Sequence, residues 1–266
     1  MERPQSVYKT LYQQQGLRFE QGADRLTVEG APDPGRIRAG GQRVQPVHQR
    51  AAVLPCPCWA ATSTLHLIPP VESRSYIDMT RSVQAAFGVQ SHWLDENTLA
   101  IPGGQHYHPC DYTVEGDYSQ AAFPAVLGAV CGGVTITGLA PETLQGDAAI
   151  LDILRRCGAV FTRTAEGISF EKAPLHGVDI DLADCPDLGP VLMVLGLLCE
   201  GTTVIRNAER LRLKESDRIA AMEAELRACG GVLESEGRHH YGARLCEQAA
   251  RSGGSFCMGT MTTVWS

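Results

Sequence analysis

Alternating cations stand directly ahead of a predicted helix in the segment RLRLKESDRIAAM, residues 210–222. If the first half of this segment is a strand, Arg210, Arg212 and Lys214 fall on one of its faces. The chain then turns at Ser216, the predicted N-cap of the helix. Because a helix N-terminus exposes unpaired N–H groups and partial positive charge, cations arriving beside it make a site suited to phosphate or carboxylate. The segment therefore predicts binding of an anionic ligand.

The predicted helix carries Asp217 in its first turn, followed by Arg218. Its apolar residues recur at helical spacing up to the glycine pair that ends it, in the order Ile219, Met222, Leu226, Cys229, Gly230 and Gly231. Taken alone, charges that alternate along a strand more commonly mark a solvated face than a binding site. On these residues both interpretations stay open.

A second candidate residue is Asp187, which stands in CPDLG just ahead of the apolar segment that begins at Pro190. That segment, PVLMVLGLLCEG, is apolar all round, which is typical of a helix with no solvent-facing side. It is too short to cross a bilayer. A carboxylate at the entrance to a buried helix usually caps it, so capping is the favoured role of Asp187 on these residues alone.

Elements that could position these side chains recur along the chain. Four segments each show a helical pattern that ends at a glycine and leads into a hydrophobic strand, and in three of them a second strand and a turn follow. The glycines are spaced 72, 70 and 72 residues apart, at Gly16, Gly88, Gly158 and Gly230. The spacing predicts a repeated α/β unit of about seventy residues, although evenly spaced helices in an unrelated α/β protein would look the same.

Four segments, in this order, resemble motifs of the EPSP synthase (3-phosphoshikimate 1-carboxyvinyltransferase) family. They are VESRSYIDMTRSVQAAFGV from Val71, VEGDYSQAAFPAVLGAVCGG from Val114, DIDLADCPDLGPVLMVLGLL from Asp179 and KESDRIAAMEAELRACGG from Lys214. The resemblance covers most of residues 1–236. It decides between the two interpretations of the cationic segment in favour of a ligand site.

The resemblance implies an inside-out α/β fold of the enolpyruvyl transferase type. Such enzymes consist of two globular domains built from repeated βαβαββ units, with parallel helices inside and sheets outside. We expect a partial first domain over residues 1–112 and a partial second domain over residues 113–266, with the boundary between Asp111 and Val114.

The implied activity is transfer of the enolpyruvyl group from phosphoenolpyruvate to shikimate 3-phosphate, a step of the shikimate pathway toward chorismate and the aromatic amino acids. By resemblance, Asp187 accepts the proton of the shikimate 5-hydroxyl, because an alcohol needs a positioned base to become a nucleophile. Lys214 would hold phosphate and shuttle a proton, and Glu215 would serve proton transfer at the methylene carbon. Arg218 would grip phosphoenolpyruvate.

Shikimate 3-phosphate has its own expected contacts in the segment SRSY. Ser73 and Tyr76 match positions that contact this substrate, and Arg74 adds positive charge. The alternative for these residues is a strand end near the surface. Within the enzymes, the related transferase acting on UDP-N-acetylglucosamine is the other candidate, but the wording of SRSYIDMT and KESDR favours the shikimate enzyme.

The chain also departs from the family pattern. We expect that it begins where family members are already well under way, without the N-terminal segment that carries their own lysine and arginine. Residues 41–62 match nothing in frame, yet a one-base shift across Gly41 to Arg50 can read GNVSSQFIS, the family's shikimate-phosphate loop. A two-base shift from Cys257 can read YGHNDHRVV, another catalytic signature, so we expect out-of-frame sequence over 41–62 and from about 237.

These departures lead us to expect no turnover from this chain alone. Each lost group would cost about a hundredfold or more in rate. A hypothesis of a different class is a non-catalytic remnant that binds an anion weakly or not at all. We also expect the tail after about residue 237 to be loosely ordered.

Composition sets the remaining expectations. A net charge of -7 argues against non-specific nucleic-acid binding, so the ligand should be small. No stretch of about 18 apolar residues occurs and the N-terminus lacks a leader pattern, which predicts a cytoplasmic protein away from membranes. The ten cysteines are scattered, and the Cys56-Pro57-Cys58 triplet is too tight for a usual zinc site. We expect reduced thiols, no metal, no cofactor and a monomer.

Overall fold

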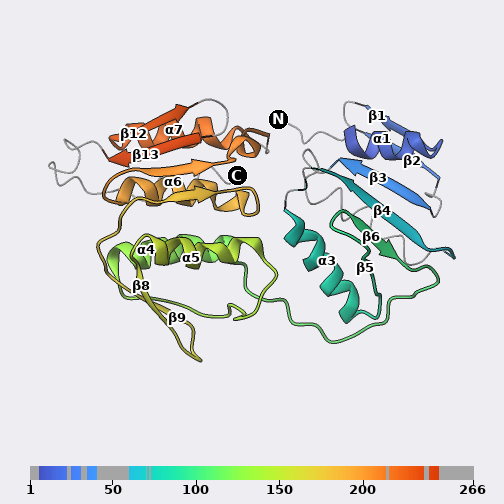
Figure 1. Cartoon of the computed structure of the whole chain (residues 1–266), viewed down its shortest axis with the longest axis horizontal. Coiled ribbons are helices and arrows are strands. Elements are labelled where there is room, and N and C mark those ends of the chain that lie inside the picture. Colours follow the sequence, from blue (N-terminus) through green and yellow to red (C-terminus); the bar gives the residue numbers. More distant parts are fainter. Residues whose placement is uncertain are drawn as a thin grey trace. The chain divides into compact units, whose positions relative to one another are not determined.

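The chain forms an α/β structure that divides into two compact units, one ending at Val114 and the other beginning at Glu115. In this computed structural model the described residues are 6–22, 25–30, 35–40, 60–69, 71, 73–213, 216–236 and 240–245. Among these residues, no helix has both the length and the apolar character needed to span a membrane. Figure 1 shows the elements of each unit.

The described part of the first unit combines a four-stranded sheet with two helices and a separate hairpin. Its described elements are α1 (Ser6–Gln14), β1 (Arg18–Gln21), β2 (Leu26–Glu29), β3 (Arg36–Gly40), β4 (Ser63–Ile68), α3 (Arg74–Ala86), β5 (His92–Trp93) and β6 (Thr98–Ile101). The sheet order is β3-β4-β6-β5, in which β3 and β4 are parallel and the other two pairs are antiparallel. Its core consists of Ile37, Leu65, Leu67, Ile77, Leu99 and Ile101.

The second unit contains two sheets. Its described elements are α4 (Tyr118–Cys131), β7 (Val134–Ile136), η2 (Gly146–Ala148), α5 (Ala149–Arg156), β8 (Val160–Arg163), β9 (Ile168–Glu171), β10 (Asp179–Asp181), η3 (Pro186–Leu188), α6 (Gly189–Leu198), β11 (Thr203–Arg206), η4 (Glu209–Leu213), α7 (Arg218–Ala228), β12 (Gly231–Glu236) and β13 (His240–Leu245). The sheet orders are β7-β9-β8 and β10-β11-β13-β12.

The strand orders confirm the repeated unit. The sheet β10-β11-β13-β12 has the same order as β3-β4-β6-β5, and in both sheets the first pair is parallel and the others are antiparallel. The sheet β7-β9-β8 reproduces the last three positions of that order. A parallel pair needs a crossover connection, and α6 supplies it between β10 and β11.

The four predicted helix ends are confirmed in detail. Gly16, Gly88, Gly158 and Gly230 all have left-handed backbone angles, with φ of 70°, 87°, 95° and 84°. After α5, the N–H of Gly158 donates to the carbonyl of Arg155 at 3.0 Å and that of Ala159 to the carbonyl of Leu154 at 2.9 Å. This pattern is the Schellman motif, in which a residue without a Cβ turns the chain out of the helix.

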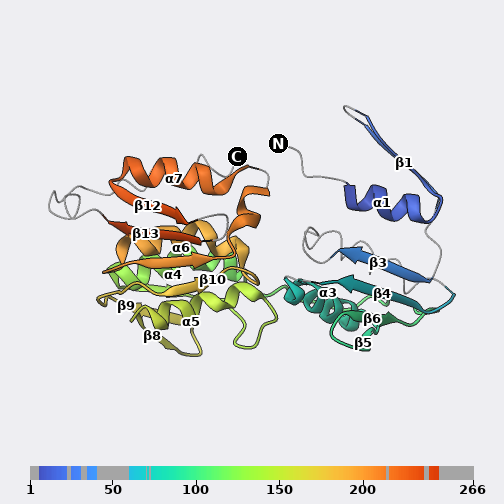
Figure 2. The ribbon, with the colours of Figure 1, turned by 45° about the horizontal axis from the view of Figure 1, so that its top comes forward.

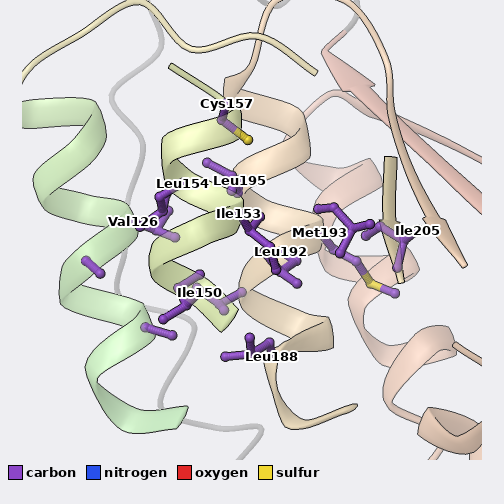
Figure 3. Close-up of a cluster of buried hydrophobic side chains, with 14 of the residues drawn as sticks. Val126, Ile150, Ile153, Leu154, Cys157, Leu188, Leu192, Met193, Leu195 and Ile205 are labelled. Atoms are coloured by element: carbon purple, nitrogen blue, oxygen red, sulfur yellow. The ribbon is translucent and has the colours of Figure 1, made fainter. Parts of the chain in front are cut away.

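The interior of the second unit is helical. Eight of the ten residues of α6 are buried, which confirms the prediction of a helix with no solvent-facing side. In α4 the space is so tight that a Cβ at Gly128 would approach Cβ of Phe170 to 2.8 Å. Helices α4 and α6 contact each other, as both ribbon views indicate (Figures 1 and 2). Figure 3 shows how Val126, Leu154 and Leu192 from α4, α5 and α6 meet in this core.

The expected loose tail is not found at residues 240–245. These residues form β13, which pairs antiparallel with β11 and β12 in the place that β6 takes in the first unit. The other stretches expected to be out of frame lie largely outside the described residues, including 41–59 and 246–266.

We predict that Gly158→Ala lowers the free energy of unfolding by about 1–2 kcal/mol, because an L-residue is strained in the left-handed region. The loss should be larger than for Gly201→Ala. Gly201 has φ of 83° and open space around its Cβ position, whereas a Cβ at Gly158 would meet the Pro174 carbonyl at 3.2 Å. Urea unfolding of both variants measures the difference, and equal losses would contradict the packing argument.

Candidate anion-binding site at the starts of α6 and α7

Two predicted site residues meet at the starts of two helices. Asp187 lies in η3, which continues directly into the buried helix α6, and Arg218 is the first residue of α7. The Nη1 atom of Arg218 donates to Oδ1 of Asp187 at 3.0 Å. The side chains are only 16% and 31% exposed, so this charged hydrogen bond is better shielded from water than a surface ion pair.

The start of α7 is fixed by Asp217. Its Oδ1 accepts the N–H of Ala220 at 3.0 Å, which makes Asp217 the N-cap. The prediction that Ser216 caps this helix is therefore wrong by one residue. Both side chains can cap, but an aspartate adds negative charge at the positive end of the helix.

The strand predicted for residues 210–214 is also wrong over its described part, residues 210–213. Residues Glu209–Leu213 form the short 3-10 helix η4, so the arginines do not share one strand face. Arg212 donates from Nη1 to Oδ2 of Asp217 at 2.9 Å, and Arg210 donates from Nη1 to the carbonyl of Ala183 at 3.3 Å. The predicted catalytic residues Lys214 and Glu215 lie outside the described residues.

Hydrogen bonds to Asp217 control its ionisation. Partial burial raises the pKa of this carboxyl, but the Ala220 N–H and the Arg212 guanidinium outweigh burial and hold the pKa below its usual value. The carboxylate is therefore charged at neutral pH, which suits its role as N-cap.

The thiol of Cys185, two residues before Asp187 in the sequence, is unsuited to nucleophilic chemistry. Burial raises the pKa of Cys185 to about 12, with further contributions from Asp147, Asp184 and Asp181. A thiol of this kind is protonated at neutral pH, and the thiolate is the reactive form. Among the described residues, no group of three or more metal-type ligands gathers that could hold an ion.

The residues predicted to contact shikimate 3-phosphate start a helix in the first unit. Ser73 is the N-cap of α3, and Arg74 and Tyr76 lie in its first turn, so the alternative of a strand end does not apply. Ser73 is buried and has φ of 54° and ψ of 40°, a left-handed conformation rare for a residue with a side chain. The Tyr76 N–H donates to the Ser73 carbonyl at 3.2 Å.

The family now follows from sequence comparison. The sequence model described as EPSP synthase (3-phosphoshikimate 1-carboxyvinyltransferase) matches residues 47–253. The chain belongs to this family. Relatives named 3-phosphoshikimate 1-carboxyvinyltransferase include those of Clostridium novyi, 36% identical over 87% of the chain and 54% of the relative, and Clostridium kluyveri, 36% identical over 89% and 56%.

Solved structures agree on the fold. An EPSP synthase from Acinetobacter baumannii is 21% identical, with a TM-score of 0.69 over 90% of this chain and 56% of that one. The enolpyruvyl transferase NikO from Streptomyces tendae is 19% identical, with a TM-score of 0.68 over 90% and 58%. These likenesses confirm the predicted enolpyruvyl transferase fold. The chain spans about half the length of the relatives that it matches.

Sequence reasoning missed two sets of contacts that this EPSP synthase family chain makes. One is the pairing of Arg212 with Asp217, and the other is a cluster around Trp93 and Asp78 beside α3. Arg212 and Asp217 are five residues apart, and a strand over residues 210–214 gives no reason to expect them to pair. The second joins residues 15 apart through a turn, which single-sequence periodicity does not encode.

We predict that Asp217→Ala lowers the free energy of unfolding by about 1 kcal/mol at pH 7, the usual loss for a removed N-cap. The side chain is 34% exposed, so water screens the Arg212 contribution. Because the folded pKa is depressed, the stabilisation is complete above the unfolded value of about 3.9 and disappears as pH falls through the folded pKa. Thermal unfolding of both proteins between pH 7 and pH 3 should show the curves converging, and a constant gap would contradict it.

Proposed function

We propose that this chain carries part of the active site for transfer of the enolpyruvyl group from phosphoenolpyruvate to shikimate 3-phosphate. The observation that best supports the proposal is the contact between Arg218 and Asp187 at 3.0 Å. It places a cation suited to an anionic substrate beside a carboxylate suited to accept a proton. The family membership and the matching relatives support the same reaction.

The proposed chemistry divides between base and cations. Asp187 takes the proton of the 5-hydroxyl as that oxygen attacks the central carbon of phosphoenolpyruvate, and the methylene carbon gains a proton. Glu215 serves this second transfer. The tetrahedral adduct then loses phosphate and one proton of its new methyl group, which restores the carbon–carbon double bond, while Lys214 and Arg218 stabilise the charge that develops.

Shikimate 3-phosphate is assigned to the start of α3 in the same proposal. Ser73 and Tyr76 contact the substrate, and the positive charge of Arg74 contributes to this end of the helix. The N-terminal end of a helix favours anions through its free N–H groups and its dipole. We also propose a cytoplasmic monomer that binds neither nucleic acid nor membrane and needs no cofactor.

A non-catalytic remnant is the second proposal. It rests on the sequence expected to be out of frame, over residues 41–62 and from about 237. The alternative substrate UDP-N-acetylglucosamine is less favoured, because the wording of SRSYIDMT and KESDR favours the shikimate enzyme and the matching relatives carry that name.

Phosphoenolpyruvate binding tests the role of Arg218. We predict that Arg218→Gln weakens binding by at least about tenfold, since hydrogen bonds to charged groups contribute strongly. Arg227→Gln is the matched control, because Arg227 lies in the same helix and pairs with Glu223 at 3.7 Å on its surface. Calorimetry measures both affinities, with circular dichroism checking the fold. Equal affinities of the two variants would contradict the assignment.

Turnover tests the second proposal. We predict no measurable phosphate release when the chain alone is mixed with phosphoenolpyruvate and shikimate 3-phosphate, because each catalytic group lost to the expected out-of-frame sequence would cost about a hundredfold or more. A phosphate assay with a full-length relative as positive control makes this decisive. Release that is lost in Asp187→Asn would show instead that the chain is an active transferase.

A further inference from the structure

Ser73 needs outside support for its backbone conformation. It is 1% exposed, lies in the left-handed region and serves as N-cap of α3 without the usual side-chain capping bond. Residues with a Cβ persist in that region only where the surroundings hold them, and such residues cluster at ligand sites. The neighbouring side chains are therefore the place to look for what holds the first turn.

Arg74, the next residue, is anchored to the β5–β6 hairpin in two ways. Its guanidinium carbon lies 4.0 Å from the centre of the Trp93 ring, close enough for a strong cation–π contact. Its Nη1 donates to the carbonyl of Glu96 at 2.8 Å. A single side chain thus ties the residue beside Ser73 to a strand and to the following turn.

Asp78 completes the cluster one turn further along α3. Its Oδ1 accepts hydrogen bonds from Nε1 of Trp93 at 2.8 Å and from Nη1 of Arg81 at 2.7 Å. Its Oδ2 lies 3.9 Å from Nε of Arg74. Arg81 in turn donates to the Ser91 hydroxyl at 3.1 Å. Two arginines therefore share one carboxylate around one indole, so the ring under Arg74 is itself fixed in place.

We propose that Arg74 is a positioning residue, which, seated on Trp93, holds Ser73 and Tyr76 in the geometry that receives shikimate 3-phosphate. This rests on the proposed function of Ser73 and Tyr76. In this role the Arg74 guanidinium acts through the hairpin instead of contacting the substrate. The arrangement fixes the first turn before the ligand arrives, so less ordering remains to be done on binding.

The test compares three variants of the full chain. Arg74→Gln removes the cation, and Arg74→Lys keeps a cation that can lie over Trp93. Arg155→Gln is the matched control, because Arg155 lies 5.0 Å from the Phe161 ring centre in the second unit. Hydrogen exchange with mass spectrometry follows the first turn of α3, including the Tyr76 N–H. Calorimetry measures the affinity for shikimate 3-phosphate.

We expect Arg74→Gln to speed exchange in the first turn of α3 by about tenfold, and to weaken shikimate 3-phosphate binding by a similar factor, because the variant loses both the cation–π contact with Trp93 and the charged hydrogen bond to Glu96. Arg74→Lys should restore most of both, and Arg155→Gln should change neither. A general loss of stability would instead speed exchange in α4 and α6 as well.

Two results would overturn the inference, and they are distinct from failure of the proposed function. Unchanged exchange in Arg74→Gln shows that Arg74 does not hold the turn. Faster exchange with unchanged affinity shows that the turn is held but does not position the ligand. If the unaltered chain and Ser73→Ala both bind no shikimate 3-phosphate, the proposed function fails for this chain and the positioning role fails with it, whatever the exchange shows.

Discussion

The burial of α6 is the constraint on which the second unit depends. A helix that is apolar on every side must be covered on every side, and α4, α7 and the strand β13 all contact it. Covering it fixes the position of η3, from which the chain enters α6, and Asp187 lies there with its side chain 31% exposed. The burial of apolar side chains thus fixes the position of Asp187. The start of α7 lies beside it, so Arg218 can bind the carboxylate.

Both candidate ligand regions lie at the N-terminus of a helix, but different contacts stabilise the two helix starts. At α7 the side chain of Asp217 caps the helix by accepting the Ala220 N–H at Oδ1, and Arg212 donates to its Oδ2. At α3 the N-cap residue Ser73 is strained, and the support comes from a side-chain cluster on the adjoining hairpin. Equivalent helix starts in a repeated unit can therefore be held by different contacts.

Much of the fold was predictable because it depends on local and periodic signals. Glycine is the usual residue where a helix ends in a left-handed conformation, so the helix ends at Gly88 and Gly158 could be predicted directly. The site was predictable only in part. Alternating charges at 210–214 resemble a strand, but packing of Leu211 in the core favours η4. The sequence does not decide whether Ser216 or Asp217 caps α7, because both side chains are good N-caps. The contact of Arg74 with Trp93 depends on a hairpin that brings residues distant in the sequence together.

The three-stranded sheet β7-β9-β8 has a consequence for self-association. In the described part of the chain it lacks the parallel strand that β3 and β10 provide in the other two sheets, so β7 lies at an edge. Exposed edges recruit foreign strands and seed aggregates, but β7 is only three residues long, from Val134 to Ile136. So short an edge strand offers few backbone N–H and C=O groups with which a strand of another molecule could pair, which limits aggregation at this edge.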